Sequence, residues 1–319
     1  MPAAAITVRG LKMRYGDVEV LKGIDLEVAS GEILGFLGPN GAGKTTTIEI
    51  LEGYRQRTAG EVSVLGVDPD HPTRAWRDRI GLVLQECELD PLLTVRETLR
   101  LYSAFYRSPR PIDEVISLVG LTGREKSRLG ALSGGQRRRA DVAVALVGDP
   151  DLIFLDEPTT GFDPTARREA WNTIEELKQL GKTVLLTTHY MEEAQHLADR
   201  VAIIRGGEIV VEGRPDEIVG EGNRQAIISF RAPAGVAPDR IAAVAELPVT
   251  ADGARVVLES DDAQAVLHQL TAWADREQLA LEAIEVRRPS LEDVFLELTQ
   301  AAERSGNAET NDPAAQNDG

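Results

Sequence analysis

The segment GPNGAGKTT, residues 38–46, has the residue types and the spacing needed to hold a polyphosphate. It matches the pattern G-x-x-x-x-G-K-[ST] between a β-rich run and a helical stretch, which is the context that the pattern requires. Glycines let backbone N–H groups approach phosphates, the Lys44 ammonium neutralises β- and γ-phosphate oxygens, and the Thr45 hydroxyl can ligate Mg²⁺. A glycine turn of purely structural role is the alternative. We favour nucleotide binding by the whole segment: Gly38, Pro39, Asn40, Gly41, Ala42, Gly43, Lys44, Thr45 and Thr46.

Two further sets of chemical groups follow apolar runs that have the pattern of buried strands. LIFLDEP places Asp156 and Glu157 at the carboxyl end of one run, and TVLLTTH places His189 at the end of another. Open α/β sheets bind ligands at that edge. We predict that Asp156 holds Mg²⁺, directly or through water, and that Glu157 polarises the attacking water as a general base. The alternative for Glu157 is that it only tunes the charge at the metal. A neutral His189 could hydrogen-bond phosphate and backbone, although a lone histidine is more often a cap or a core residue.

The segment LSGGQ, residues 132–136, places a serine and two glycines at the start of a helical stretch. A helix N-terminus offers free N–H groups and the positive end of the helix dipole, so this arrangement indicates anion binding. Three arginines, residues 137–139, follow directly. They could assist phosphate attraction, but we predict that they form a solvated helix face.

Alternating β-rich and helical runs position these groups. The runs AITVRG, VEVLKGIDLEVA and GEILGFLG open the chain, and a helical stretch from Lys44 to about Gly53 follows. From Thr94 to about Gly120 the spacing is again helical, with Thr94 as the N-cap. LIFL and TVLL lack polar alternation, as expected of central strands covered on both faces. The alternation of strand and helix predicts βαβ units around a parallel sheet, and hence an α/β fold.

Charge and composition narrow the class of protein. The chain has 319 residues and a formal net charge of −17 at pH 7, which argues against nucleic-acid binding because phosphate backbones attract positive surfaces. No apolar run approaches the roughly 18–20 residues that span a bilayer. The N-terminal segment lacks the basic and apolar regions of a signal peptide. Cys87 is the only cysteine, so no internal disulfide can form, which fits a reducing cytosol. We expect a soluble, intracellular protein.

A shift in composition predicts a domain boundary. Residues 221–319 contain 8 Arg, no Lys and 18 acidic residues. Within them, the runs AIISF, ARVVLES and LEAIEV, with a helix over about 261–276, predict a small α/β domain with a regulatory or dimerisation role. The last part of the chain is polar, lacks periodicity and is predicted to be disordered. The expected divisions are a main domain, a small domain and a tail, at residues 1–222, 223–300 and 301–319.

The glycine-rich segment, Gln85, LSGGQ, LIFLDEP, the GFD turn and His189 follow one another in this order. In that order they resemble the ATP-binding-cassette (ABC) ATPases over roughly residues 5–220. The resemblance implies a P-loop NTPase fold with a mostly parallel sheet core, an N-terminal antiparallel β subdomain and a helical subdomain. It implies ATP and Mg²⁺ as cofactors, ATP hydrolysis as the activity, and stacking of Tyr15 on adenine. Gln85 joins both the Mg²⁺-binding set and the catalytic set, which comprises Glu157, His189, Gln85 and Lys44.

The same resemblance implies that two cassettes pair head to tail. Each LSGGQ segment then closes over the γ-phosphate held by the other chain. The residues that would bind this phosphate are Ser133, Gly134, Gly135 and Gln136. Asp163, in the turn after Glu157, would signal across the interface. The turn has Phe162 where the family often has Leu, an exchange of one apolar residue for another.

The segments TTHYMEEA, ADRVAIIRGGEIVVEGRPDEI and RPSLEDVFLELT resemble ATPase subunits of ABC-2-type exporters, above all drug- and antibiotic-resistance pumps of the daunorubicin type. This implies a homodimeric motor at the cytoplasmic face of the membrane that powers efflux of a drug, antibiotic or lipid-like substrate. The substrate would pass through a separate integral-membrane permease, whose coupling helix the stretch of about 89–129 would receive beside Gln85. The alternative is a soluble ABC ATPase that acts on nucleic acid, ribosomes or a cytosolic assembly. The lack of a long coiled-coil insertion, the single P-loop and the acidity disfavour it, and the SLEDVFLELT helix counts against an importer.

Overall fold

A computed structural model of the chain describes residues 4–83, 89–220 and 225–296. The chain divides into two compact units, Met1–Pro215 and Asp216–Gly319. Cores of packed apolar side chains lie within each unit. The domain limit expected at residue 222 and the expected tail over 301–319 lie outside the described residues, so the proposed division into three parts stays a prediction.

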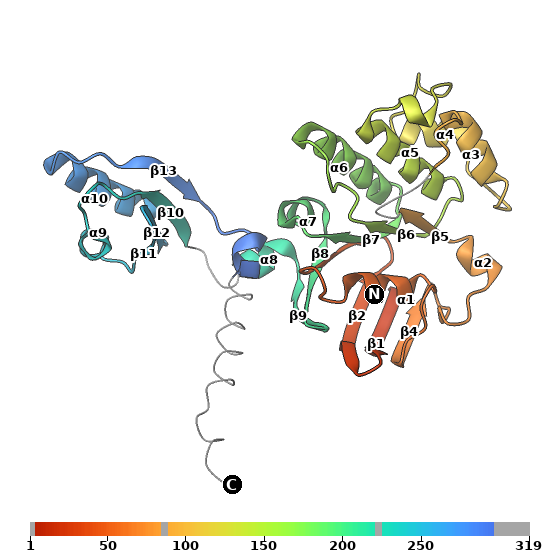
Figure 1. The fold of residues 1–319 in the computed structure, drawn as a ribbon, viewed down its shortest axis with the longest axis horizontal. Helices are drawn as coiled ribbons and strands as arrows, with labels where there is room; N and C mark the ends of the chain where they lie inside the picture. The colour runs from red at the N-terminus through yellow and green to blue at the C-terminus, as the bar shows by residue number, and fades with distance from the viewer. Residues whose placement is uncertain (1–3, 84–88, 221–224, 297–319) are drawn as a thin grey trace, which may run out of the picture. The chain divides into compact units, whose positions relative to one another are not determined.

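A six-stranded sheet forms the centre of the first unit (Figure 1). Its strands, in spatial order, are β5 (Ile80–Val83), β6 (Leu152–Asp156), β7 (Thr183–Thr188), β3 (Ile33–Leu37), β8 (Arg200–Arg205) and β9 (Glu208–Gly213). All neighbours pair in parallel except β8 and β9, which are antiparallel. Strands β6, β7 and β3 are adjacent, so their carboxyl ends meet at one edge of the sheet. The predicted α/β fold with a mostly parallel sheet is confirmed.

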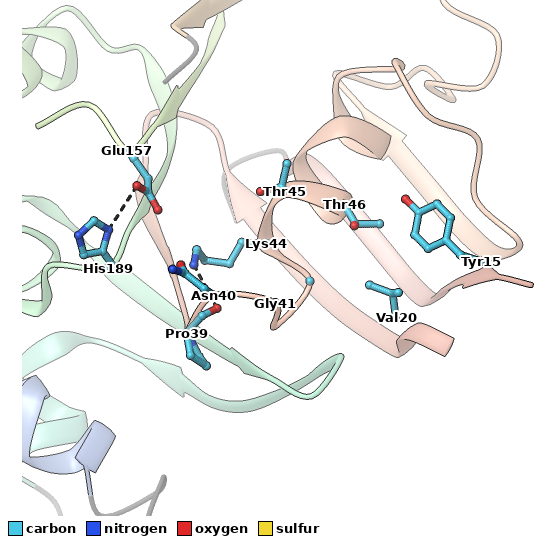
Figure 2. Close-up of a pocket in the computed structure, with 11 residues that line it drawn as sticks. Tyr15, Val20, Pro39, Asn40, Gly41, Lys44, Thr45, Thr46, Glu157 and His189 are labelled. Carbon is cyan, nitrogen blue, oxygen red and sulfur yellow. Dashed lines mark hydrogen bonds and ion pairs between the residues drawn. The ribbon is translucent and has the colours of Figure 1, made fainter. Parts of the chain in front are cut away.

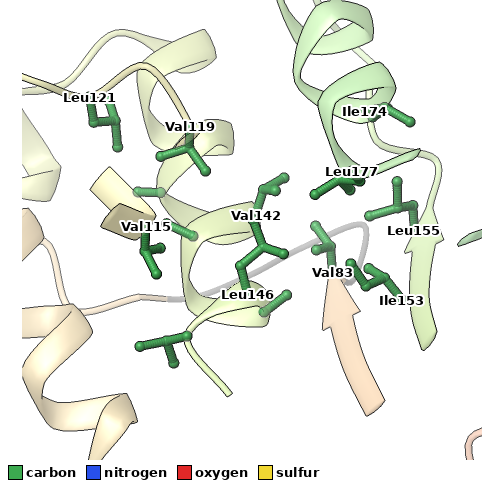
Figure 3. Packing of buried hydrophobic residues seen from close by; sticks show 14 of the residues in the cluster. Val83, Val115, Val119, Leu121, Val142, Leu146, Ile153, Leu155, Ile174 and Leu177 are labelled. Atoms are coloured by element: carbon green, nitrogen blue, oxygen red, sulfur yellow. The ribbon is translucent and has the colours of Figure 1, made fainter. Parts of the chain in front are cut away.

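Alternate residues of strand β6 pack into two different cores. Leu152 and Phe154 belong to one core, and Ile153 and Leu155 belong to the other. Figure 3 shows Ile153 and Leu155 beside apolar residues of helices, among them Val142. The helices that contribute to this core include α3 (Val95–Ser103), α4 (Ile112–Leu118), α5 (Gly134–Leu146) and α6 (Pro164–Gln179). The strand is therefore covered on both faces, which is why its sequence has no polar alternation.

A three-stranded antiparallel sheet packs against the core that contains Leu152 and Phe154. Its spatial order is β2 (Val18–Ala29), β1 (Ala4–Tyr15) and β4 (Ala59–Val64). Helix α1 (Lys44–Leu51) and helix α2 (Arg74–Arg77) pack against it, and the Trp76 indole N–H of α2 donates to the Val64 carbonyl at 2.8 Å. The predicted N-terminal antiparallel β subdomain is confirmed.

The helical stretch predicted over 94–120 consists of two helices, α3 and α4. Pro109 and Pro111 lie between them, and proline disfavours the interior of a helix while fitting its first turn. Thr94 is the N-cap of α3, as expected, in a capping box with Glu97. The remaining helical segments of this unit are η1 (Leu129–Ala131) and α7 (Met191–Leu197). None of the helices formed by the described residues combines the length and the apolar composition that crossing a bilayer requires.

The second unit contains a four-stranded antiparallel sheet in the spatial order β11 (Thr250–Asp252), β12 (Arg255–Ser260), β10 (Ala226–Arg231) and β13 (Glu282–Arg287). Its helices are α9 (Pro238–Ala245) and α10 (Ala263–Arg276), and helix α8 (Pro215–Gly220) precedes the sheet. Phe230 of the sheet and Leu270 and Trp273 of α10 share one buried core. This is the small α/β unit that the sequence predicts, and the expected helix over 261–276 matches α10.

Candidate functional site

A cavity of about 730 Å³ lies at the carboxyl edge of β3, β6 and β7 (Figure 2). β3 leads into the glycine-rich segment, β6 ends just before Glu157, and β7 ends just before His189. The volume suits a ligand of nucleotide size. The residues that line the cavity are Tyr15, Val20, Pro39, Asn40, Gly41, Gly43, Lys44, Thr45, Thr46, Glu157 and His189. Parts that are far apart in the sequence thus meet at one place, as expected of an open α/β sheet.

Two positions of the glycine-rich segment accept only glycine. A Cβ at Gly38 would lie 2.3 Å from the Ile204 carbonyl oxygen, closer than any real contact. At Gly43 the backbone has a left-handed φ of 112°, and a Cβ would lie 2.6 Å from the Leu21 side chain. The loop is therefore pressed against the strands beneath it, and its backbone stays free of side chains at these points.

The N-terminus of helix α1 opens at the cavity, because Lys44, Thr45 and Thr46 are its first residues and all line it. Lys44 Nζ donates to the carbonyls of Gly38, at 2.7 Å, and Pro39, at 3.3 Å. Burial lowers the pKa of Lys44, whereas the negative charges of Glu157 and Asp156 oppose that shift. The helix N-terminus and the lysine together favour a polyphosphate anion here.

Thr187 of β7 forms hydrogen bonds with both acidic residues at the end of β6, Asp156 and Glu157. Its hydroxyl donates to the Asp156 carboxylate at 2.5 Å. The Glu157 N–H donates to both the carbonyl and the hydroxyl oxygen of Thr187, each at 3.1 Å. Thr187 is not among the site residues predicted from the sequence, although its place as a polar residue at the end of the apolar run TVLL could have indicated it.

Glu157 has a left-handed backbone, with φ at 45°. Residues other than glycine rarely adopt this conformation, and such strain is concentrated at functional sites. The Glu157 side chain is only 14% exposed and accepts a hydrogen bond from the Thr160 hydroxyl at 3.1 Å. His189 Nδ1 lies 3.3 Å from the same carboxylate oxygen, as the dashed line in Figure 2 shows. The structure brings Glu157 and His189 together; their catalytic roles stay predictions.

Tyr15 presents an aromatic ring to the cavity and is 41% exposed. The Arg55 guanidinium lies 5.2 Å from the ring centroid, and Arg55 pairs with Glu49 at 2.6 Å. A partly exposed ring at the cavity wall can stack on a nucleotide base. Its position is compatible with the adenine contact that the family resemblance implies.

The residues present also fit a magnesium site. Thr45 supplies a hydroxyl in the cavity, and Asp156 ends the adjacent strand, close enough to Lys44 to influence its pKa. Mg²⁺ in nucleotide sites usually takes one or two protein oxygens, with phosphates and waters completing the octahedron. Gln85, the third residue of the predicted set, lies outside the described residues.

A second cavity, of about 260 Å³, contains the LSGGQ glycines and shares no residue with the first. Its lining residues are Ser133, Gly134, Gly135, Gly161, Phe162, Asp163, Thr165, Ala166 and Glu169. Helices α5 and α6 both begin here, so two helix N-termini face the same cavity. The two helix N-termini favour an anion here, although the carboxylates of Asp163 and Glu169 also line the cavity. Within one chain, then, most of the predicted phosphate-binding residues line two separate cavities, while Gly38, Ala42 and Gln136 line neither.

Each of these helices has a side-chain cap. Ser133 Oγ accepts from the Gln136 N–H at 3.3 Å, and Gln136 Oε1 accepts from the Ser133 N–H at 3.2 Å, which forms a capping box. Asp163 accepts from the N–H groups of Thr165 and Ala166, both at 2.9 Å. Gln136 and Asp163 therefore have a local capping function, to which the predicted phosphate and signalling roles would be additional.

The predicted solvated face over residues 137–139 is wrong for Arg138. This side chain is buried, at 8% exposure. Its Nε donates to the Pro158 carbonyl at 3.0 Å, and its Nη2 donates to the Asp156 carbonyl at 3.2 Å. Arg137 is exposed, and Arg139 pairs with Glu169 at 2.7 Å. Consecutive helical residues point about 100° apart, so three adjacent arginines do not share one face.

A third cavity, of about 410 Å³, lies between α1, α2, β5, α3 and α5 and is mainly aromatic and apolar. Its lining residues are Glu52, Gly53, Tyr54, Trp76, Arg77, Ile80, Leu82, Tyr102, Tyr106, Val144 and Ala145. Burial, together with the neighbouring Asp156 and Glu49 charges, raises the pKa of Glu52 to about 8. The carboxyl group is therefore neutral in the folded protein at neutral pH.

Glu52→Gln is expected to stabilise the protein at pH 7 and above. The pKa of Glu52 is about 8 when folded, against an ordinary 4.5 when unfolded. Between these values the folded state holds a proton that the unfolded state has lost, so stability falls as pH rises through this window. We expect a gain of about 1–3 kcal/mol in unfolding free energy at pH 7, and a weaker pH dependence. Urea unfolding at pH 5, 7 and 8.5 measures both, with the exposed Glu61→Gln as the control; a pH dependence equal to that of the parent contradicts the prediction.

The fold and the first cavity define a P-loop nucleotide-binding protein. Residues 21–160 match the family described as ABC transporter, and residues 226–290 match the family described as ABC transporter domain-containing protein-like, C-terminal domain. The chain is 38% identical over 306 residues to the daunorubicin resistance ATP-binding protein DrrA3 of Streptomyces coeruleorubidus, covering 94% of this chain and 97% of that protein. It is 39% identical to the Nod factor export ATP-binding protein I of Rhizobium meliloti (strain 1021), covering 93% and 89%. The chain belongs to the ABC transporter family, as one of its ATP-binding, ATP-hydrolysing cassettes.

Solved structures agree with the fold of the first unit. One is cbiO1 from Clostridium perfringens, part of the ABC transporter complex cbiONQ, with a TM-score of 0.63 and 26% identity over 69% of this chain and 92% of that chain. Another is the dimeric structure of MJ0796, a bacterial ABC transporter cassette, with a TM-score of 0.57 and 29% identity over 66% and 98%. The cassette fold inferred from the sequence is thus confirmed.

Proposed function

We propose that this chain is the motor subunit of an ABC-2-type exporter. It powers the efflux of a drug, an antibiotic or a lipid-like molecule through a separate membrane permease, at the cytoplasmic face of the membrane. The observation that supports this most strongly is the likeness to relatives named for daunorubicin resistance and Nod factor export, which extends through both units of the chain.

ATP occupies the first cavity in this proposal. Tyr15 stacks on the adenine, while Lys44 and the N-terminus of α1 neutralise the phosphates. Glu157 accepts a proton from the water that attacks the γ-phosphorus, the bond to the β-bridging oxygen breaks, and ADP and phosphate result. His189, beside Glu157, orients this carboxylate and the γ-phosphate. Mg²⁺ held by Thr45 and Asp156 would supply positive charge to the β- and γ-oxygens.

Two copies of the chain pair head to tail. This arrangement is supported by the separation of the two phosphate-binding cavities within one chain, since the cavity at Ser133 shares no residue with the cavity at Lys44. A solved relative is also dimeric. In the pair, the Ser133 hydroxyl and the N–H groups of Gly134 and Gly135 bind the γ-phosphate held by the other chain, which sandwiches ATP between the copies.

The third cavity receives the permease. Its aromatic lining continues onto the surface, where Tyr54 is 71% exposed and the neighbouring Phe105 is 61% exposed, with the Phe105 ring against Tyr102. Large exposed apolar side chains around a hollow are typical of protein interaction sites. A short amphipathic helix from the cytoplasmic side of the permease fits this surface.

Purification from native membranes tests the proposed function. The full chain, carrying an affinity tag, is isolated from detergent-solubilised membranes of its source cell, and the copurifying proteins are identified by mass spectrometry. We expect an integral-membrane permease in near-stoichiometric amount. Tyr54→Glu, which places a charge beside the third cavity, should reduce its recovery, whereas Glu61→Gln should not. Copurification of ribosomal or other soluble assemblies, without a permease, would contradict the proposal.

Removal of the second unit is expected to leave nucleotide binding intact. All residues that line the first cavity lie between Tyr15 and His189, within the first unit. A chain ending after residue 222 should bind a fluorescent ATP analogue with a dissociation constant within about twofold of the full chain. Circular dichroism verifies that the shortened chain is folded. Loss of binding by a folded truncation would show that the second unit contributes to the site.

A further inference from the structure

We propose that Arg138 is a positioning residue for ATP hydrolysis, which ties the LSGGQ helix to the backbone that holds Glu157. The inference rests on the proposed pairing of two chains and on Glu157 as the base. Within one chain, it links the cavity proposed to bind the partner's γ-phosphate to the base that activates water at the chain's own ATP.

Among the hydrogen bonds of Arg138, two go to the residues on either side of Glu157 in the chain. The guanidinium donates to the carbonyls of Asp156 and Pro158, at 3.2 Å and 3.0 Å, and these are the residues immediately before and after Glu157. On the other side, the Glu157 N–H is held by Thr187 at 3.1 Å. The backbone around Glu157 is thus fixed from α5 and from β7 at once.

Glu157 needs such fixation because its left-handed backbone, with φ at 45°, is unfavourable for a residue with a side chain. A strained conformation of this kind persists only when the surroundings hold it in place. Loss of the Arg138 contacts would let the turn relax and move the carboxylate. A displacement of about 1 Å at a reacting group costs on the order of a hundredfold in rate.

Arginine suits this task better than other side chains. Its planar guanidinium carries five donors in a fixed fork and can bond two carbonyls together, which the single ammonium of lysine does less well. The charge is compensated by Asp141, one turn further along α5, at 3.7 Å from Nη1 and also buried, at 7% exposure. Asp141 Oδ1 has no hydrogen-bond partner among the described residues. Asp141 therefore balances the buried charge of Arg138, while the two carbonyl contacts of Arg138 fix the backbone on either side of Glu157.

The position of Arg138 on α5 connects the N-terminus of this helix, at Ser133, with the backbone around Glu157. Ser133 caps the same helix, and Arg138 follows in its second turn. A helix moves as a rigid rod over this length, so a phosphate that draws the cap toward the partner also shifts the guanidinium. Because the guanidinium holds both carbonyls around Glu157, closure of the paired chains aligns the base.

The test compares turnover with nucleotide binding in the purified full chain. Arg138→Lys keeps the charge beside Asp141 but loses the fork. The double variant Arg138→Met/Asp141→Leu removes the buried pair as a whole, which similar exchanges show to be tolerated in protein interiors. The matched control is Arg139→Met, on the same helix, whose partners are Glu169 and the Gly120 carbonyl. Measured quantities are kcat, the KM for ATP, the melting temperature and the elution volume with Mg·ATP.

We expect kcat to fall about ten- to hundredfold in both Arg138 variants, with the KM for ATP within about twofold of the parent. The double variant should melt near the parental temperature, and both should accumulate ATP-bound dimer because closure precedes the impaired step. The control should match the parent. A double variant with parental kcat overturns the proposal. A loss of kcat confined to Arg138→Lys would then reflect only the lower melting temperature of that variant. Glu157→Gln is measured in parallel: if that variant hydrolyses ATP normally, the base assignment fails, independently of Arg138.

Discussion

Glu157→Gln is expected to lower the ATPase rate by about 10²–10⁴-fold, the usual contribution of a positioned general base. The amide keeps the size of the side chain and its hydrogen bond from Thr160 but has lost the basic oxygen. ATP should still bind, because its proposed contacts come from the P-loop and from Ser133 of the other chain. In the proposed pairing, hydrolysis separates the two chains, so the variant should accumulate as an ATP-bound dimer. Size-exclusion chromatography with Mg·ATP, alongside a phosphate-release assay, measures both effects.

Two further variants separate the roles of the site. Asp156→Asn should weaken Mg²⁺ binding and yield little dimer, because the carboxylate proposed to hold the metal is gone. Adding Ser133→Arg to Glu157→Gln should abolish the trapped dimer, since a bulky side chain fills the second cavity where the partner's γ-phosphate would lie. A Glu157→Gln protein that traps ATP but elutes as a monomer, even with its permease, would contradict the pairing of two chains. Normal turnover by Glu157→Gln would contradict the assignment of the base.

The parts of the site that the sequence predicts are those that a local pattern specifies. A strand followed by GPNGAGKTT and a helix has one geometry, because the glycines permit a tight loop and the helix start supplies N–H groups. LIFLDEP and TVLLTTH are apolar runs that end in polar groups, so the side chains at their ends must meet at one edge of a parallel sheet. The family and the cassette fold follow from the order of these patterns.

The parts that the sequence does not predict depend on packing between segments. Residues 137–139 are chemically identical, yet only Arg138 turns inward, and the choice depends on where α5 meets the loop after β6. Glu157 has a left-handed backbone although nothing in its own residue type requires it. The helix expected over 94–120 breaks because two prolines override the apolar spacing around them. From the sequence alone, Glu52 would be taken as a charged residue at the end of a helix. Its raised pKa, which makes it neutral, arises mainly from burial in the folded protein.

Lys44→Ala is expected to abolish measurable turnover and to weaken ATP binding greatly. Its ammonium already lies within the glycine-rich loop, bonded to the Gly38 and Pro39 carbonyls, where it needs little rearrangement to reach a phosphate. Removal of one preorganised charged group at a site of developing charge typically costs about 10²–10³-fold in rate. Here the loss should be at least as large, since the same ammonium also offsets the phosphates of bound ATP.

The Lys44→Ala protein should remain folded, which makes its inactivity informative. Burial lowers the pKa of Lys44, so the fold gains no stability from charging this group, and its removal relieves that cost. The melting temperature should therefore stay near the parental value in the absence of nucleotide. ATP should raise the melting temperature of the parent, and of the exposed control Lys12→Ala, but not of Lys44→Ala, because only a bound ligand stabilises the native state. Turnover near the parental rate in a folded Lys44→Ala protein would refute the P-loop assignment, since no other lysine of the described chain lines that cavity.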